Sequence, residues 1–345
     1  MKKILLVTDA WYPQVNGVVR VFATLMPLLE ARGFTVTLVE PSQFRSVPMP
    51  FYREIAWSLF PKRTVGRMIA KEAPEYVHIA TEGPLGLAAR SVCIARGIPF
   101  TTSYHTHFQL HLEARIGTAL TGAAYAFLRW FHKPASATMV VTEHLRETLQ
   151  AHGFAHVSVW PLGVDTNLFT RVERPSSELQ KPVFVYMGRL SPEKSVEEFL
   201  SLSLPGSKLV IGDGPQRASL EQTYGKTAHF VGYKKGQELV ELLSAADVMV
   251  FPSRTETFGL VIVEALACGV PVAAHDVMGP NDILTDGVDG YLDEDLADAA
   301  MRCLALRPED CRATALRYSW ERSAQVFTNL LSPISHNRDR MKVHE

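Results

Sequence analysis

Short apolar segments alternate with helical patterns in two separate series, and this alternation constrains the fold more than any other feature of the sequence. The first series opens with the apolar run Lys3–Val7, a helical pattern over Val18–Ala31 and a second apolar run over Thr35–Val39. The second series opens with Val183–Met187. Strands that are apolar throughout are typical of parallel sheets covered by helices. The sequence therefore predicts two doubly wound α/β domains.

Chain length and a polar stretch near the middle support this division. A chain of 345 residues exceeds the usual size of one hydrophobic core. Residues 171–182 are polar, contain two prolines and predict a linker between a first domain over residues 1–170 and a second over residues 183–318. The charged residues 335–345 predict a flexible tail.

Composition excludes several classes of protein. Lysine and arginine total 35 and aspartate and glutamate total 36, a balance that argues against nucleic-acid binding. The four cysteines lack CxxC spacing and predict reduced core thiols. The first apolar run is too short for a signal peptide, and no run approaches the roughly 18 apolar residues of a membrane-spanning helix. We therefore expect an intracellular protein.

A polar turn between an apolar strand, Val248–Phe251, and a buried helix, Leu260–Cys268, has the pattern of an anion site. Gly259 lies in this turn, and a helix that starts there presents free N–H groups and the positive end of its dipole. Glu256 lies in the turn, and Glu264 lies in the otherwise apolar helix. A carboxylate in such a helix needs a hydrogen-bonding partner from the protein or from a ligand.

The two glutamates allow two interpretations. In the first, Glu256 is a solvated loop residue and Glu264 has a salt-bridge partner within the protein. In the second, a phosphate group binds between them, so that the two carboxylates meet hydroxyl groups at opposite ends of a sugar nucleotide.

The string from Glu256 to Glu264 resembles the Glu-x₇-Glu motif of retaining glycosyltransferases of family 4. Further strings resemble motifs of the same family in the same order, namely Gly163–Phe169, Gly188–Lys194, Gly212–Pro215, Gly287–Tyr291 and Tyr318–Arg322. The resemblance runs from the first strand to Trp320. It implies the GT-B fold, in which two Rossmann-like domains face a central cleft and a C-terminal helix, here residues 319–334, crosses back to the N-terminal domain.

The resemblance also implies roles for individual residues. Catalytic roles fall on His105, which would reach the donor sugar, on Arg189 and Lys194, which would neutralise the leaving diphosphate, and on Glu256, which would hold sugar hydroxyls. Donor binding falls on Gly17, Arg189, Lys194, Asp213, Gly214, Val231, Thr257, Phe258, Gly259, Leu260 and Glu264. Acceptor binding falls on Asp9, Tyr12, Asn16 and His107. Each residue also has an ordinary alternative, such as a turn glycine, a helix-capping charge or a structural imidazole.

We expect no metal and no resident cofactor. His105, His107 and His111 could suggest a metal, but the alternating pair His105 and His107 in a strand-end loop lacks helical i, i+4 spacing, and no carboxylate completes a set nearby. Asp293-Glu294-Asp295 precedes an amphipathic helix, where acids suit the first turn. The first strand–helix loop lacks GxGxxG, which disfavours a nicotinamide dinucleotide. The resemblance implies a UDP- or GDP-linked sugar as co-substrate.

Two stretches, residues 44–67 and 127–133, interleave aromatic and cationic residues. Such a mixture is typical of surfaces that contact a membrane interface. The alternative for the first stretch is a long loop and a helix on the sheet edge, and for the second it is core packing. The loops around Asn16 and His105 resemble those of the bacterial branch that glycosylates membrane lipids, so we expect a peripheral protein on the cytoplasmic face of the cell membrane.

Together these features predict metal-independent transfer of a hexose, with retention of configuration, from a nucleotide sugar to a lipid such as diacylglycerol or a glycolipid. The same chemistry on a soluble saccharide or sugar phosphate is an alternative. A nucleotide-sugar epimerase and a non-catalytic donor-binding protein are two others. Arg189, Lys194, Glu256 and Glu264 together argue against the non-catalytic protein.

Overall fold

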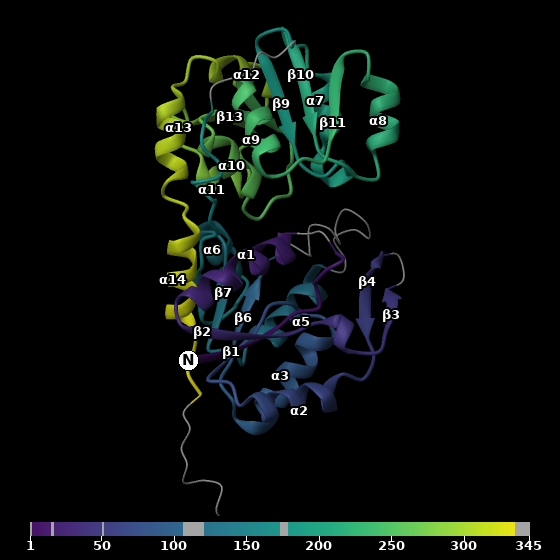
Figure 1. Cartoon of the computed structure of the whole chain (residues 1–345), viewed down its shortest axis with the longest axis vertical. Coiled ribbons are helices and arrows are strands. Elements are labelled where there is room, and N and C mark those ends of the chain that lie inside the picture. Colours follow the sequence, from purple (N-terminus) through teal and green to yellow (C-terminus); the bar gives the residue numbers. More distant parts are fainter. Residues whose placement is uncertain (1, 15–16, 50–51, 106–120, 173–178, 335–345) are drawn as a thin grey trace, which may run out of the picture. The chain divides into compact units, whose positions relative to one another are not determined.

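The computed structural model describes residues 2–14, 17–49, 52–105, 121–172 and 179–334, and the chain divides into two compact units (Figure 1). The first unit comprises Met1–Trp160 and Ala324–Glu345, and the second comprises Pro161–Ser323. Each contains a six-stranded sheet whose paired strands are all parallel. This confirms the predicted doubly wound α/β class.

The sheet of the first unit has the strand order β2-β1-β5-β6-β7-β8. Its strands are β1 (Lys2–Val7), β2 (Phe34–Val39), β5 (Tyr76–Ile79), β6 (Thr101–Tyr104), β7 (Ala137–Val140) and β8 (Val157–Val159). The connecting helices are α1 (Gly17–Ala31), α2 (Lys62–Glu72), α3 (Pro84–Arg96), α5 (Thr121–His132) and α6 (Glu143–Ala151). The central strand β1 is buried from Ile4 to Val7, and Leu5 and Val7 pack in one core with Leu85 of α3.

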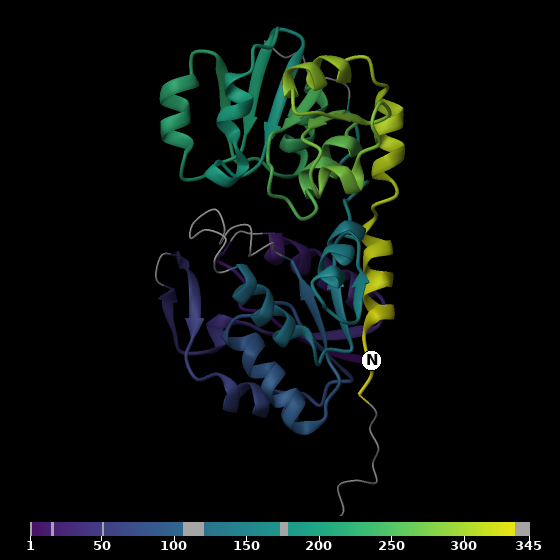
Figure 2. The same ribbon diagram turned by 180° about the vertical axis from the view of Figure 1, so that it is seen from behind.

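Residues 44–67 contain an antiparallel hairpin that the sequence interpretation missed. Strand β3 (Ser46–Met49) pairs with β4 (Tyr52–Ser58), and helix α2 follows. The hairpin lies outside the six-stranded sheet (Figures 1 and 2). Pro48 lies inside β3 next to an irregularity in the register. Proline disfavours sheet pairing except at edges and bulges, so the local sequence indicated a loop instead.

The sheet of the second unit has the strand order β11-β10-β9-β12-β13-β14. Its strands are β9 (Val183–Met187), β10 (Ser207–Ile211), β11 (Ala228–Gly232), β12 (Val248–Phe251), β13 (Val272–Ala274) and β14 (Gly290–Leu292). The helices are α7 (Val196–Ser201), α8 (Arg217–Tyr224), α9 (Gly236–Ala245), α10 (Leu260–Ala267), α11 (Pro280–Ile283), α12 (Leu296–Cys303) and α13 (Pro308–Ala315).

The units divide between Trp160 and Pro161, earlier than the domain end expected at residue 170. The reason lies in Arg312 of α13, whose guanidinium donates hydrogen bonds to the carbonyl oxygens of Thr166, at 2.7 Å, and Phe169. Residues 162–169 therefore belong to the second unit. Helix α14 (Trp320–Leu330) contributes residues to both units, and from Ala324 onward the chain groups with the first.

In both sheets the strand that comes first in the sequence lies inside the sheet, and later strands are added on both sides of it. The order changes direction between β1 and β5 in the first unit and between β9 and β12 in the second. At such a point the loops after the two adjacent strands diverge, and the space outside their carboxyl ends is the usual ligand site of this fold class. Each unit therefore has one topologically favoured site.

Candidate active site

In the second unit, the loops after β9 and β12 bring together two residues predicted to be catalytic. The ammonium group of Lys194 donates a hydrogen bond to Oε2 of Glu256 at 2.7 Å. The other carboxylate oxygen of Glu256 accepts a bond from the backbone N–H of Thr257 at 3.1 Å. Both side chains are about one-fifth exposed, at 24% and 19%. The pair is therefore formed and still accessible to a ligand.

The same two loops are tied by hydroxyl groups. Ser253 and Thr255 both donate hydrogen bonds to the carbonyl oxygen of Glu193, at 3.4 and 3.2 Å. Burial raises the pKa of the Glu193 carboxyl, but a hydrogen bond from Ser191 and the charges of Lys194 and Arg189 outweigh it, so the net pKa is lowered. Arg189 itself is exposed. The loop after β9 thus carries two cations around one stable carboxylate.

Glycines in the next loop allow its backbone to pack directly on the loop after β9. A Cβ on Gly214 would lie 2.4 Å from the carbonyl oxygen of Leu190, and a Cβ on Gly212 would lie 1.8 Å from that of Gly188. Between them, the N–H of Leu190 donates to the carbonyl of Asp213 at 2.9 Å. These contacts explain why both motifs contain glycine, because any side chain would separate the loops.

Asp213 does not extend freely toward a ligand. Its carboxylate accepts bonds from the N–H of Gly214 and from Arg217, both at 2.8 Å, and these bonds lower its pKa. Val231, another predicted donor contact, lies half-buried in the neighbouring strand β11.

The N-terminus of α10 forms the wall beside Glu256. Gly259 precedes the helix with φ +91°, a conformation that side chains rarely adopt, and Leu260 is its first residue. The first amides of a helix have no acceptor within it and suit an anion. Phe258 is buried and packs edge-on against Tyr318, with ring centroids 5.7 Å apart. Glu264 is 3% exposed on the buried part of α10, so it lies in the helix wall as predicted from the sequence.

One residue of this site, Gly279, was missed by the sequence interpretation. It has φ +92°, and a Cβ there would lie 3.2 Å from Cβ and Cγ of Glu256 and 3.2 Å from the carbonyl of Phe258. The loop after β13 therefore supports the stem of Glu256. The Gly279-Pro280 pair is a turn signal that could have identified a loop here, but not what it contacts.

In the first unit, Asp9 lies at the corresponding point between β1 and β5, where it caps helix α3. Its Oδ1 accepts a bond from the N–H of Leu85 at 2.8 Å, and its Oδ2 accepts from Gly86 at 3.2 Å and from the Thr81 hydroxyl at 2.9 Å. A Cβ on Gly83, the residue before α3, would lie 2.5 Å from the Asp9 carboxyl carbon. Burial raises the pKa of Asp9, although these bonds oppose the shift. Its predicted role in acceptor binding stays a prediction.

His105 follows β6 and is packed edge-on against Phe22 and Trp160, with ring centroids 5.4 and 5.7 Å apart. Burial lowers its pKa to about 4, so the ring is neutral near pH 7. Gly17 opens α1, and a Cβ there would meet nothing within 4 Å, so its backbone is accessible. Tyr12 is exposed. Asn16 and His107 lie outside the described residues, and their roles stay predictions.

The three acids 293–295 have partners within the protein. Asp295 caps α12 by accepting bonds from the N–H groups of residues 297 and 298. Asp293 pairs with Arg302 at 2.6 Å, and Glu294 pairs with Arg254 at 2.9 Å. Among the described residues, no group of three or more His, Cys, Asp or Glu side chains has an arrangement that could hold a metal ion.

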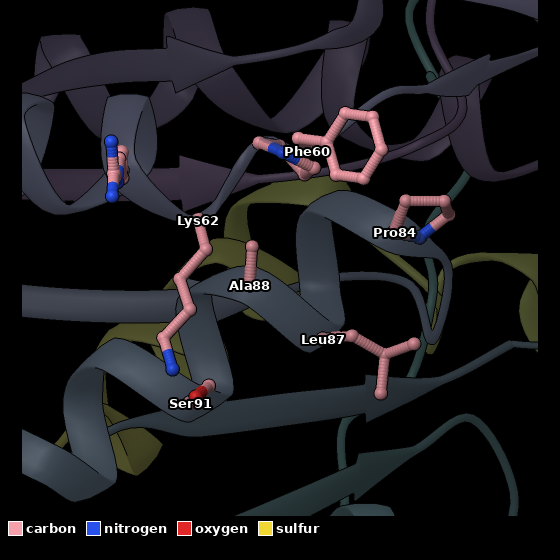
Figure 3. Close-up of a pocket in the computed structure, with 8 residues that line it drawn as sticks. Phe60, Lys62, Pro84, Leu87, Ala88 and Ser91 are labelled. Carbon is pink, nitrogen blue, oxygen red and sulfur yellow. The ribbon is translucent and has the colours of Figure 1, made fainter.

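The two predicted membrane-contact stretches both lie against α3. Phe60, which is 93% exposed, forms a groove with Lys62, Arg63 and one side of α3. In Figure 3, Lys62 runs past Ala88 toward Ser91 on that helix. From the other stretch, Trp130 stacks on the guanidinium of Arg90 at 3.8 Å. We give the name aromatic–basic surface to eight exposed residues of these stretches: Trp57, Leu59, Phe60, Lys62, Arg63, Phe127, Arg129 and Trp130.

Within the part of the chain that the structure describes, none of the helices combines the length and the apolar character needed to cross a membrane.

Comparison with known proteins agrees with this geometry. Residues 15–168 match the model of Glycosyltransferase Family 4, and residues 170–310 match that of Glycosyl transferases group 1. A sulfoquinovosyl transferase of Arabidopsis thaliana is 29% identical over 83% of this chain, which spans only 62% of that protein. A GDP-mannose-dependent alpha-mannosyltransferase of Mycobacterium tuberculosis is 29% identical over 84% of this chain and 83% of its own length.

An alpha-monoglucosyldiacylglycerol synthase of Streptococcus pneumoniae is 27% identical over 94% of this chain and 83% of its own. Among solved structures, the sucrose-phosphate synthase of Thermosynechococcus elongatus superposes with a TM-score of 0.73 at 20% identity, covering 96% of this chain and 98% of that one. The structural likeness supports the GT-B fold. Because the two family models together cover most of the sequence, the chain belongs to the glycosyltransferases, with a family 4 domain followed by a group 1 domain.

Proposed function

We propose that this glycosyltransferase moves a hexose, with retention of configuration, from a nucleotide-diphosphate sugar to a membrane lipid such as diacylglycerol or a glycolipid. The observation that carries the proposal is the pairing of Lys194 with Glu256 between β9 and β12. A cation and a carboxylate at this point match the two parts of the donor, its diphosphate and its sugar hydroxyls.

The proposed donor site distributes its charges along the nucleotide sugar. Arg189 offers a planar fork and Lys194 a point charge for the phosphate oxygens. The first amides of α10, after Gly259, add uncharged donors for the same group. Glu256 would accept hydrogen bonds from the hexose, and Glu264 from the ribose. Before the donor binds, Lys194 and Glu256 neutralise each other, so binding exchanges this pair for two contacts with the ligand.

In the proposed reaction, the bond between the anomeric carbon and the diphosphate oxygen breaks, and the nucleoside diphosphate leaves with the bonding electrons. The acceptor hydroxyl forms its bond to the same face of the anomeric carbon, and its proton passes to the leaving phosphate oxygen. Arg189 and Lys194 stabilise the charge that develops on that phosphate. We propose that no metal ion takes part, and addition of a chelator tests this point.

The aromatic–basic surface supports a lipid acceptor. A phenylalanine that is 93% exposed is costly in water and gains free energy by entering an acyl boundary. Lys62 and Arg63 beside it suit anionic headgroups, each contributing about 1 kcal/mol near such a surface. The similarity to a diacylglycerol-glucosylating enzyme supports the same acceptor class. Peripheral attachment to the cytoplasmic face of the membrane is therefore part of the proposal.

The test is release of nucleotide from UDP-glucose, UDP-glucuronate and GDP-mannose by the purified protein, with and without liposomes of diacylglycerol and anionic lipid. We expect one donor to be consumed only with liposomes, with an α-linked glycolipid as product and no effect of chelator. Donor consumption at the same rate with and without liposomes would instead indicate a soluble acceptor or hydrolysis. Isomerisation of the donor alone would indicate an epimerase.

Two substitutions with matched controls refine this test. Glu256→Ala should lower transfer by about 100- to 1,000-fold, the usual cost of losing one transition-state contact. Glu238→Ala removes another glutamate from a lysine pair, with Lys234, and should leave transfer unchanged. Phe60→Ser should weaken liposome binding, whereas Leu316→Ser, at an exposed apolar residue of the second unit, should not. Full activity of Glu256→Ala would refute the assigned site.

A further inference from the structure

Four charged side chains from four different segments of the second unit meet beside the donor-binding loops. Nε2 of His275, which follows β13, lies 2.9 Å from Oε1 of Glu198 in α7. Arg254, in the loop after β12, makes two hydrogen bonds to Glu294, at 3.3 and 2.9 Å, and lies 3.7 Å from Glu198. Glu294 also lies 3.9 Å from Nδ1 of His275. We call these residues the four-charge cluster.

His275 is completely buried, and both of its ring nitrogens face oxygen atoms. Nδ1 lies 3.2 Å from the carbonyl oxygen of Asp293, which can only accept a hydrogen bond, so Nδ1 carries a proton. Nε2 faces the carboxylate of Glu198, which accepts a second bond when ionised. The doubly protonated ring therefore satisfies both partners. Two cations and two carboxylates then balance, as a buried charge requires.

The cluster is connected in sequence to both donor-binding loops. Glu198 lies four residues after Lys194, and Arg254 lies two residues before Glu256. Because Arg254 and His275 both pair with Glu198, the start of α7 and the loop after β12 are held at a fixed separation. The Lys194–Glu256 pair depends on that separation. Core packing alone does not explain a histidine at this position, because the preceding strand β13 consists of valine and alanine.

We propose that His275 and Arg254 are positioning residues that act through Glu198 and Glu294 to place Glu256 against the donor sugar. The assignment rests on the proposed function, because Glu256 is taken as the sugar contact. Misplacing a catalytic contact by about 1 Å can cost on the order of 100-fold in rate. Loss of either cation should therefore slow transfer while the nucleotide-binding residues stay in place.

The experiment compares His275→Ala, His275→Gln and Arg254→Ala with Arg307→Ala. The control removes another bidentate pair, between Arg307 and Asp310, on the exposed start of α13. We expect kcat to fall about 10- to 100-fold in His275→Ala and Arg254→Ala, with UDP or GDP affinity by calorimetry changed less than about threefold. Because its amide can still donate one bond, His275→Gln should recover part of kcat. Arg307→Ala should match the parent protein.

A structural effect alone would produce a different pattern. It would lower the number of nucleotide-binding sites per chain in step with Tm, and would leave kcat per bound site unchanged. That result would overturn the proposal. Amide hydrogen exchange over residues 252–259 gives a measure that is independent of turnover, and we expect faster exchange in His275→Ala but not in Arg307→Ala.

If the parent protein transfers no sugar, the proposed function fails, while hydrogen exchange still tests the cluster. If the parent protein is active and the variants match it in kcat and exchange, only the cluster proposal fails.

Discussion

The two units place one carboxylate each at the same point of the same topology, but they use it differently. Between β1 and β5, Asp9 accepts three hydrogen bonds from its own unit, two of them from the first amides of α3. Between β9 and β12, Glu256 pairs with Lys194 of the neighbouring loop, and both side chains are partly exposed. The strand order of the sheet therefore determines where such a polar side chain lies. Whether that side chain is available for binding depends on the nature of its partners.

The histidines extend this contrast. In the first unit, His78 is completely buried and bonded to the hydroxyls of Thr101 and Ser103, and burial lowers its pKa to about 3. His105 has its pKa lowered to about 4 for the same reason. In the second unit, His275 is equally buried but faces carboxylates. His78 and His105 are thus buried as neutral imidazoles, whereas His275 is buried beside carboxylate partners.

The largest expected difference is in acid stability. Because His78 and His105 have pKa values lowered from 6.5 by burial, the folded first unit binds fewer protons than the unfolded chain below pH 6.5, and its stability falls as the pH falls. At about 1.4 kcal/mol per pKa unit, the two rings together lower the free energy of unfolding of the first unit by about 4 kcal/mol at pH 5. In the second unit, Glu193 and Asp293 have lowered pKa values, so their contributions are lost only below their unfolded values of 4.5 and 3.8.

Urea unfolding at pH 7 and pH 5, followed by tryptophan fluorescence, measures this difference. Four of the five tryptophans, residues 11, 57, 130 and 160, belong to the first unit. We expect their transition to move to lower urea at pH 5, and His78→Gln to reduce that movement. An equal shift of the urea transition in both units would contradict the expected difference in acid stability.

The next effect concerns the cap of α3. Asp9→Ala leaves the amides of Leu85 and Gly86 without their acceptor and should lower the unfolding free energy of the first unit by about 3 kcal/mol. Asp9→Asn keeps one acceptor and should cost about 1 kcal/mol. Thermal unfolding tests both, with Glu256→Ala expected to change stability by less than about 1 kcal/mol. An Asp9→Ala protein that is fully stable but has lost acceptor affinity would reassign Asp9 to the acceptor site.

The smallest effect is on thiol protection. Burial raises the pKa of Cys93 in the first unit and of Cys268 in the second to about 12, so both are unreactive in the folded state. UDP or GDP at ten times its Kd should slow alkylation of Cys268, which ends α10, by about tenfold through ligand linkage. Alkylation of Cys93 should not change. Peptide mass spectrometry distinguishes the two thiols, and equal protection of both would place nucleotide contacts in the first unit as well.

Sequence patterns predicted the regular elements well wherever a local signal marked both ends. Strands β9 and β12 match their predicted bounds. Strand β9 lies between Pro182 and Gly188, which mark its two ends. The β3–β4 hairpin was missed because Pro48 is a local signal against a strand that its partner strand overrides.

The site was predictable only in part. The presence of Lys194 and Glu256 in strand-end loops followed from topology and family resemblance, and the structure joins them. Gly279 behind Glu256 and the bond from α3 to Asp9 link residues that are far apart in the chain. No periodicity or spacing encodes such contacts, because they depend on how neighbouring loops fold over one another.

The close backbone contact between the loops after β9 and β10 has a consequence for engineering and for evolution. Because Gly212 and Gly214 meet Gly188 and Leu190 without space for a methyl group, neither loop can be lengthened or given a bulkier residue at these points alone. In the proposed donor site, a change of base would therefore come from side chains at the open ends of these loops or from the strand beyond them, β11. A library that randomises those positions and leaves the four residues fixed would retain folded proteins while sampling new donors.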